Sequence, residues 1–386
     1  MSFRSIGRRI LSYINVLFPK FNQVIVEGGP NIESNAIAVA NYISQHYDIP
    51  VFYVISNKKN DDPRKLLSPG ISTLKLIGGR WPSINYLLRY LTSRFIFLTH
   101  KSFLDYFSDR QTVINIWHGV LYKNVRLLDK GLPIPADITV GTSQSTKKMF
   151  SEAFGVSEDS VYVSGYPRND MLLKAKKNKN QLRRNINGFD NFKKIAIWLP
   201  TYRKNPLREQ DDGNEVGNPF YISDFNISNF NKILKSGNCL CLVKPHPNAP
   251  DYQGYQNLSN VRIIEDKWIT NQGLTLYQLL GCTDFLISDV SSVIIDYMLL
   301  DQPIICVSTD FNEYRKSRGF YFDDIENRIP SRINRNQESF FRHIDNILQN
   351  DADPSEQKRK ELKSYFFDNY KSCSTEKLVK YALDPN

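Results

Sequence analysis

The sequence has no run of about 18 apolar residues, which is the length that a membrane-spanning helix needs. Its N-terminus is basic and partly apolar, but no clean apolar stretch precedes a small-residue cleavage site, so we expect no secretory signal. It has no Walker A sequence, which excludes a P-loop nucleoside triphosphatase. Gly28 and Gly29 follow an expected strand without GxGxxG spacing, which makes a dinucleotide site a weak prediction.

Cysteine is scarce, and the five residues, at positions 239, 241, 282, 306 and 373, are odd in number. They lie mostly in apolar runs, which predicts reduced core residues of a cytosolic protein. No second pair of Cys or His residues has zinc-finger spacing, so we expect no metal site.

Positive charge is in excess, with 50 Lys and Arg residues against 40 Asp and Glu residues and a net charge of +10. A basic chain favours an anionic partner, which by charge alone could be nucleic acid, a phosphorylated substrate or acidic lipid. No RNA- or DNA-binding motif is present, and Tyr and Phe are not interleaved with the basic segment 174–194. We therefore expect no nucleic acid partner.

The 386 residues are enough for two domains, and 41% of them are hydrophobic. Short β-rich runs alternate with helical patterns, which predicts βαβ units, parallel sheets and an α/β fold. The expected strands are 23–27, 51–55, 95–99, 113–117, 138–141, 161–164, 194–199, 239–243, 261–264, 284–287 and 304–307. The expected helices are 33–46, 142–154, 274–280, 292–300, 338–349 and 355–369.

Two polar segments interrupt this alternation. Segment 174–194 is Asn-rich and strongly basic, which predicts a linker or an exposed helix and a domain boundary near residue 190. Segment 205–224 is a polar loop of about twenty residues, and loops of that length are usually functional or mobile.

Ligands of open parallel sheets bind at the carboxyl ends of the strands, so polar clusters there are candidate site residues. His118 ends an apolar strand, and Gly119 permits a sharp turn behind it. A histidine there can accept a proton near neutral pH, or simply cap the strand. Arg203 and Lys204 place two cations past the strand 194–199, although surface pairs of this kind are common.

Two further clusters suit phosphate. Lys244 and His246 follow a strand, and the prolines around His246 stiffen that turn. Ser291 and Ser292 stand between a strand and a helix; capping needs one serine, while two make an anion site. Asp296, about one turn into that helix, could reach a ribose hydroxyl or favour the helix N-terminus electrostatically. Together the clusters predict a transfer reaction on a phosphorylated or nucleotide-activated substrate.

Six short motifs occur in an order that resembles the CDP-glycerol:poly(glycerophosphate) glycerophosphotransferase family, the teichoic-acid-type polymerases. Each motif alone is modestly specific, but six in order are hard to obtain by chance, and the similarity spans roughly residues 20–380. The motifs are WHG at 117–119 with Lys123, GYPRND at 165–170, PTYR at 200–203, KPHP at 244–247, SDVSS at 288–292 with Asp296, and RGFYF at 318–322.

The resemblance implies a GT-B-like fold, with two Rossmann-like domains and the active site in the cleft between them. Residues 1–20 would be a basic amphipathic segment, 21–190 the acceptor domain and 191–386 the CDP-donor domain. The last helices would be free to pack back on the N-terminal domain.

The resemblance also implies transfer of glycerol or ribitol phosphate from a CDP-alditol to a growing teichoic-acid-like or capsule polymer, with release of CMP. The acceptor would be an anionic polymer or glycolipid, and no metal or organic cofactor is implied. His118 would be the general base, and His246 would support the pyrophosphate. The donor would be bound by Arg203, Lys244, Ser291, Ser292 and Asp296, with Lys123, Arg168 and Asp289 as further candidates.

A CMP-sugar transferase of the GT-B class, acting with sialic acid or Kdo, is the alternative function. Such enzymes share the His-Pro element and the paired serines, so those motifs do not discriminate. They are expected to use an acidic base in the N-terminal domain, for which Glu27 is the candidate. The motifs at 117–119 and 165–170 favour the first function.

The first 20 residues combine basic side chains with apolar ones at helical spacing. A basic amphipathic helix can lie on anionic lipid, or it can pack against its own domain. We therefore expect a cytoplasmic protein, with peripheral binding to the inner face of the cell membrane as an open alternative. The residues concerned are Arg4, Arg8, Arg9, Lys20, Ile6, Ile10, Ile14 and Leu17.

Overall fold

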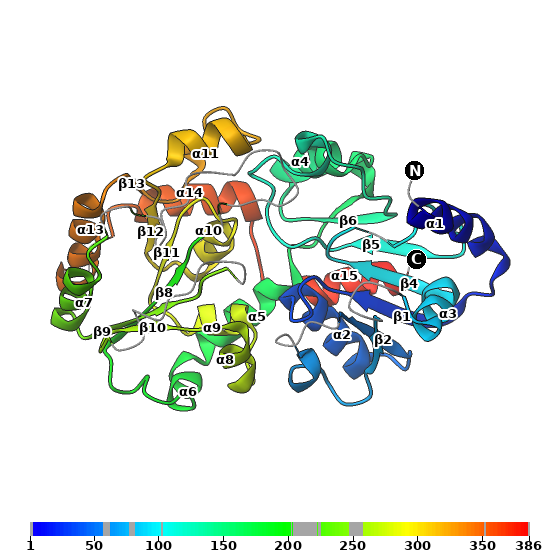
Figure 1. Cartoon of the computed structure of the whole chain (residues 1–386), viewed down its shortest axis with the longest axis horizontal. Coiled ribbons are helices and arrows are strands. Elements are labelled where there is room, and N and C mark those ends of the chain that lie inside the picture. The colour runs from blue at the N-terminus through cyan, green and yellow to red at the C-terminus, as the bar shows by residue number, and fades with distance from the viewer. Residues whose placement is uncertain are drawn as a thin grey trace.

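The structure, a computed structural model, describes residues 3–56, 62–76, 82–101, 103–201, 203, 222, 225–246, 258–350 and 353–384. It is an α/β fold with two parallel sheets, each surrounded by helices (Figure 1). The first half of the chain builds the sheet on the right of the figure, and the second half builds the sheet on the left.

The first sheet has the strand order β3-β2-β1-β4-β5-β6-β7, and all its neighbours pair in parallel. The order reverses between β1 and β4, which is the position where ligands of doubly wound sheets bind. The strands are β1 (Phe21–Glu27), β2 (Val51–Ile55), β3 (Ser72–Lys75), β4 (Ser93–Leu98), β5 (Thr112–Asn115), β6 (Ile138–Gly141) and β7 (Val161–Val163).

The second sheet has the order β10-β9-β8-β11-β12-β13, also all parallel, and it reverses between β8 and β11. Its central strands are buried on both faces, which explains why they are continuous apolar runs rather than alternating ones. The strands are β8 (Lys194–Leu199), β9 (Cys239–Val243), β10 (Val261–Ile263), β11 (Phe285–Ser288), β12 (Ile304–Val307) and β13 (Ile333–Asn334).

Helices cover both sheets, and two of them connect the halves of the molecule. An added Cβ at Gly281 would lie 2.5 Å from the carbonyl oxygen of Leu172, so α9 and α5 pack backbone against backbone. The α-helices are α1 (Phe3–Ile14), α2 (Ser34–His46), α3 (Ile84–Thr92), α4 (Lys147–Phe154), α5 (Pro167–Lys177), α6 (Lys179–Arg184), α7 (Ile227–Ser236), α8 (Asp266–Asn271), α9 (Leu276–Gly281), α10 (Val293–Tyr297), α11 (Phe311–Arg318), α12 (Ile325–Arg328), α13 (Gln337–Asn350), α14 (Glu356–Phe367) and α15 (Ser374–Leu383).

The last helix, α15, packs on α2 and α5 beside the first sheet (Figure 1). Asp170 in α5 fixes its start, because that carboxylate accepts hydrogen bonds from the backbone N–H groups of Ser374 (3.0 Å) and Thr375 (2.8 Å). The GYPRND motif therefore ties α15 to the N-terminal half. The domain limits at residues 20 and 190 stay a prediction.

The α/β expectation is confirmed, and nearly all expected strands appear within two residues of their predicted bounds. The edge strands β3 and β13 were not predicted, and neither were several helices of the described residues, such as α3, α7 and α15. The loop expected at 205–224 lies outside the described residues, apart from Ile222.

The basic segment 174–194 is helical in its first part rather than a linker, because it forms the end of α5 and all of α6. Several of its cations have protein partners. Lys179 and Arg183 both pair with Asp284 at 2.5 Å, and Lys176 donates to the carbonyl oxygen of Leu300. The segment is therefore less of an open cationic surface than its composition predicts.

No helix in the described part of the chain is long and apolar enough to span a membrane. Four of the five cysteines are buried, Cys373 is half-buried, and none forms a disulfide.

Candidate functional site

His118 stands on a sharp turn just past β5. Trp117 before it has a φ of 43°, a left-handed value that is uncommon for a residue with a large side chain. The turn is held on both sides, because Asn35 donates to the Trp117 carbonyl (3.1 Å) and the Trp117 N–H donates to Asn115 (3.2 Å). The strained turn thus has a specific support, and it places His118 at the sheet edge.

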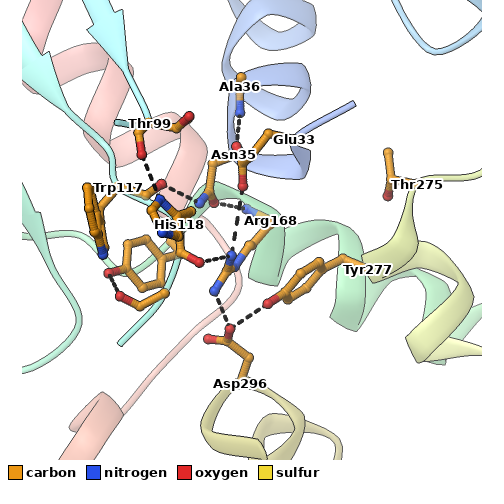
Figure 2. Close-up of polar contacts among 12 residues, drawn as sticks. Glu33, Asn35, Ala36, Thr99, Trp117, His118, Arg168, Thr275, Tyr277 and Asp296 are labelled. Carbon is orange, nitrogen blue, oxygen red and sulfur yellow. Dashed lines mark hydrogen bonds and ion pairs between the residues drawn. The ribbon is translucent and has the colours of Figure 1, made fainter. Parts of the chain in front are cut away.

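The His118 imidazole is oriented for accepting a proton. Its Nδ1 atom lies 2.8 Å from the carbonyl oxygen of Thr99, which can only accept, so the neutral ring carries its proton on Nδ1 (Figure 2). The side chain is solvent-exposed although protein surrounds it closely. Burial lowers its pKa to about 4, and the charge of Arg168 adds to this effect. The ring is therefore neutral at pH 7, with Nε2 available as a base.

Arg168, from the GYPRND motif, joins the two halves of the site (Figure 2). Its guanidinium donates to the carbonyl oxygen of His118 (2.7 Å) and to Asp296 of α10 (2.5 Å), and the Tyr277 hydroxyl also donates to Asp296 (2.6 Å). Burial opposes the charge on Arg168, but Asp296, Tyr277 and Glu33 together raise its pKa above the usual value. Arg168 therefore carries a fixed charge directly behind the histidine.

This network occupies Asp296. Its side chain is fully buried, and both oxygens accept hydrogen bonds, Oδ2 from Arg168 and Tyr277 and Oδ1 from Asn169 (3.4 Å). In this structure the carboxylate therefore holds α10 against α5. The contact with a ribose hydroxyl expected for Asp296 stays a prediction.

Gly119 and Ser292 bring the edges of the two sheets into contact. A Cβ added at Gly119 would lie 2.5 Å from the Ser292 hydroxyl oxygen and 3.5 Å from the Arg168 guanidinium. Only glycine allows this approach. The structure thus places a serine of the SDVSS motif directly beside the histidine turn, as strand-end clusters in both sheets would require. Ser291 and Ser292 are both half-buried.

Arg203, expected to contact a phosphate, is instead enclosed between two carboxylates. It is only 1% exposed, and it donates to Asp310 and Asp289, each at 2.7 Å. Burial raises the pKa of Asp289, but Arg203 and Lys123 outweigh that effect and hold it below the usual value. In this structure Arg203 organises the turn after β8, because it also donates to the carbonyl oxygen of Thr201 (2.9 Å), and its contact with a phosphate stays a prediction.

The remaining candidates lie at neighbouring strand ends. Lys244 follows β9 and pairs with Asp266 at 2.9 Å, so its charge is partly satisfied by the protein. His246, two residues further on, is exposed. The Lys123 Nζ atom lies 5.2 Å from the ring centre of Tyr314, and residue 123 bridges to Phe320 of the RGFYF motif.

Some residues at this site were missed from the sequence. His100 follows β4, and its Nε2 atom lies 4.0 Å from Glu27 at the end of β1. The strand-end rule applies to His100 as it does to His118, so the sequence did carry a signal. Burial raises the pKa of Glu27 to about 7, and burial also lowers the pKa of His100.

Glu33, Asn35 and Tyr277 carried no such signal. They matter because the fold brings the start of α2 and the helix α9 against Arg168, a tertiary contact that the sequence does not reveal. Asn35 accepts from the Arg168 N–H (3.0 Å), and Glu33 lies 3.8 Å from the Arg168 guanidinium. Within the described residues, no three His, Cys, Asp or Glu side chains gather as a metal site would require.

Known proteins resemble this chain over most of its length. A teichoic acid poly(glycerol phosphate) polymerase of Staphylococcus epidermidis is 25% identical over 384 residues, 92% of this chain and 49% of the relative. A teichoic acid glycerol-phosphate transferase of Staphylococcus aureus is 23% identical over 371 residues, 88% of this chain and 86% of the relative. The chain spans about half the length of several of these curated relatives.

Among solved structures, the wall teichoic acid polymerase TagF superposes with a TM-score of 0.74 at 21% identity, over 98% of this chain and 92% of that one. This likeness shows a shared fold. The family model for CDP-glycerol:poly(glycerophosphate) glycerophosphotransferases matches residues 13–383. The chain therefore belongs to the CDP-glycerol:poly(glycerophosphate) glycerophosphotransferase family.

Proposed function

We propose that this protein transfers an alditol phosphate, glycerol or ribitol phosphate, from a CDP-alditol to a growing teichoic-acid-like or capsule polymer and releases CMP. One observation carries the proposal. A neutral histidine with a free Nε2 atom stands at one sheet edge, and Gly119 beside it touches Ser292 at the other. This proximity supports a base and a hydroxyl-bearing anion site that act together, as transfer between two substrates requires.

The proposed arrangement is GT-B-like, with two Rossmann-like domains and the active site between them. Its support is that both sheets have the doubly wound strand order and that their carboxyl edges approach each other at Gly119 and Ser292. In this arrangement the N-terminal half receives the acceptor, and the C-terminal half receives the CDP-alditol.

The proposed reaction is a displacement at phosphorus. Nε2 of His118 takes the proton of an acceptor hydroxyl, whose oxygen forms a bond to the β-phosphorus of the donor. The bond from that phosphorus to the bridging oxygen breaks, and CMP leaves with the electron pair. A positioned general base of this kind contributes about 10²–10⁴-fold to the rate.

On the donor side, we assign His246, Lys244, Ser291 and Ser292 to the phosphates. Arg203 with Asp289, and Arg168 with Asp296, position these groups from behind. The polymerase TagF, which shares this fold, has also been solved after a soak with CDPG. The soak concerns TagF itself, and it supports a CDP-alditol as the first donor to test with this protein.

We also propose that the protein works at an anionic membrane surface. Helix α1 and the turn after it carry exposed apolar side chains, among them Ile10 (56% exposed), Tyr13 (63%) and Leu17 (78%). Arg8 of the same helix instead pairs inward with Asp105 at 2.6 Å. The outer face is thus apolar, with the exposed Arg9 beside it, which suits contact with anionic lipid.

The test is product analysis by mass spectrometry. Purified protein is incubated with an alditol-phosphate acceptor and, in parallel, with CDP-glycerol, CDP-ribitol and CMP-sialic acid. We expect CMP release together with a mass gain of one or more alditol phosphate units. Transfer from CMP-sialic acid alone would instead favour the CMP-sugar alternative, with Glu27 as its base.

A further inference from the structure

Arg126 is the least satisfied cation near the candidate site. It begins a short 3-10 turn (Arg126–Asp129) after the WHG motif, and its φ is 54°. Its Nε and Nη2 atoms are buried without a hydrogen-bond partner in the described structure. Arg126 as a whole is half-buried, but guanidinium N–H groups that are buried without a partner are costly, and a native protein seldom keeps them without a ligand.

The charge of Arg126 acts on two histidines and a lysine, while Asp129 of the same turn pairs with Arg318. The Arg126 charge reaches His100, Lys101 and His118, and it lowers the pKa of each. The carboxylate of Glu27 lies 4.0 Å from His100, and it contacts that histidine rather than Arg126 in the described structure. Within the described residues no carboxylate pairs with Arg126, so its charge and that of Lys101 lie near the neutral base without a protein counter-ion.

The turn that carries Arg126 is fixed by the second half of the chain. Arg318 pairs with Asp129 at 2.8 Å, and the Asn124 N–H donates to the Gly319 carbonyl at 3.3 Å. The RGFYF motif thus clamps the turn from the opposite half. Packing against the second half of the chain therefore holds the left-handed backbone of Arg126 and keeps its side chain near the histidines.

We propose that Arg126 binds a phosphodiester group of the acceptor, next to the hydroxyl that His118 deprotonates. This inference rests on the proposed function. In a displacement at phosphorus, the attacking oxygen approaches opposite to the leaving CMP. Arg126 lies with His118 in the N-terminal half, whereas Ser291 and Ser292 come from the other sheet. A cation in the same half as the base therefore lies nearer to the acceptor than to the donor pyrophosphate.

The chemistry of such an acceptor fits. A poly(alditol phosphate) carries a phosphodiester one alditol away from its terminal hydroxyl, so base and phosphate cation must lie near each other. The planar guanidinium is suited to two phosphate oxygens at once. Contact with the transferred phosphoryl group of the donor is the competing assignment, and the experiment separates the two.

The experiment uses Arg126→Gly in the full chain. Glycine accepts the left-handed φ without strain, so the variant should fold at least as well as the wild type. Lys130→Gly is the matched control, because Lys130 lies in the same loop with a φ of 55° but is exposed. Arg126→Asn, which also tolerates this backbone, is the second variant.

Initial rates are measured against the concentration of a short poly(glycerol phosphate) acceptor at saturating CDP-alditol, and against donor at saturating acceptor. We expect the acceptor KM to rise about 10- to 100-fold in both Arg126 variants, which is the usual effect of losing a charged hydrogen bond. The donor KM should stay unchanged, and so should both constants in Lys130→Gly.

Binding of the same oligomer to wild type and to Arg126→Gly is measured in parallel by calorimetry, which needs no turnover. An unchanged acceptor KM with unchanged oligomer binding would overturn the inference and leave the proposed function standing. A raised donor KM would overturn it in favour of the donor assignment. Absence of transfer by the wild type from any CDP-alditol would refute the proposed function, and equal oligomer binding by both proteins would then refute this inference too.

Discussion

The backbone carbonyl of Thr99, rather than a carboxylate, orients His118. No fixed negative charge therefore raises its basicity, and its neighbours Arg168 and Arg126 lower it further. In the proposed reaction, the acceptor proton is taken by a weak base whose advantage is its position. Bound substrate phosphates would shift the balance, because nearby negative charge raises the pKa of an imidazole.

Replacement of His118 by alanine should abolish most of the transfer. We expect kcat to fall about 10²- to 10⁴-fold, since the acceptor hydroxyl loses its base, while CDP-alditol binding is retained. Stopped-time product assays and donor calorimetry measure the two effects. His46→Ala is the control, because His46 also bonds a backbone carbonyl through Nδ1 (2.9 Å) but lies at the end of α2 rather than at a strand end. Undiminished turnover in His118→Ala would refute the base assignment.

The pH dependence should show the lowered pKa. A base acts when neutral, so kcat/KM should stay high as the pH falls below 6.5 and decline only as it approaches about 4. The profile should also be recorded in Glu27→Gln, because Glu27 has a pKa of about 7 and titrates within the same range. An acidic limb near 6.5 in both proteins would contradict the expectation, and circular dichroism at each pH would confirm that the fold persists.

At the scale of elements, the ion pair of Arg168 and Asp296 joins α5 to α10. Asp296→Asn removes the closer of the two carboxylates that face the buried Arg168 charge and leaves Glu33 at 3.8 Å, and we expect the free energy of unfolding to fall by about 3–5 kcal/mol. Urea unfolding measures this change. Glu338→Gln, which breaks an exposed pair with Arg342, should leave stability nearly unchanged. An unchanged stability with a raised donor KM would instead place Asp296 at the ribose.

The contact between the turn after β5 and the start of α10 is a second test at this scale. Gly119→Ala would push Ser292 away, and overpacking of this kind usually costs about 1–3 kcal/mol. We expect reduced transfer together with reduced stability, and recovery of stability when Ser292→Gly is added. Gly7→Ala, where an added Cβ meets nothing within 4 Å, is the control. Full activity in Gly119→Ala would show that this contact does not organise the site.

The same elements show what a sequence can and cannot predict. Buried strands such as β8 and β9 are continuous apolar runs, so they were predictable, whereas β13 has two residues and offers no pattern. Strand ends identified His118 and Ser292. The burial of Arg203 and Asp296 was not predictable, because it depends on carboxylates and tyrosines supplied by distant segments, such as Asp310 and Tyr277.

At the scale of the whole molecule, α1 presents its apolar face outward at one end (Figure 1). Ile10→Ser and Leu17→Ser should each weaken co-sedimentation with anionic vesicles about 10-fold, because each removes an apolar side chain from the lipid contact. Leu132→Ser, at a 63% exposed position elsewhere, is the control. Vesicle binding that survives deletion of residues 1–18 would exclude this face as the membrane contact.

The return of α15 to the first half has a consequence for synthesis. The strands of the first sheet are complete at Val163, but part of the surface of α2 and α5 is covered by the much later residues Ser374–Leu383. The ring of Tyr381 stacks on Tyr162 at 3.8 Å, so this late helix closes an early surface. While the ribosome is still making the second sheet, the surface of α2 and α5 that α15 later covers remains in contact with water. The packing of the N-terminal half is thus complete only when the last helix of the chain has been made.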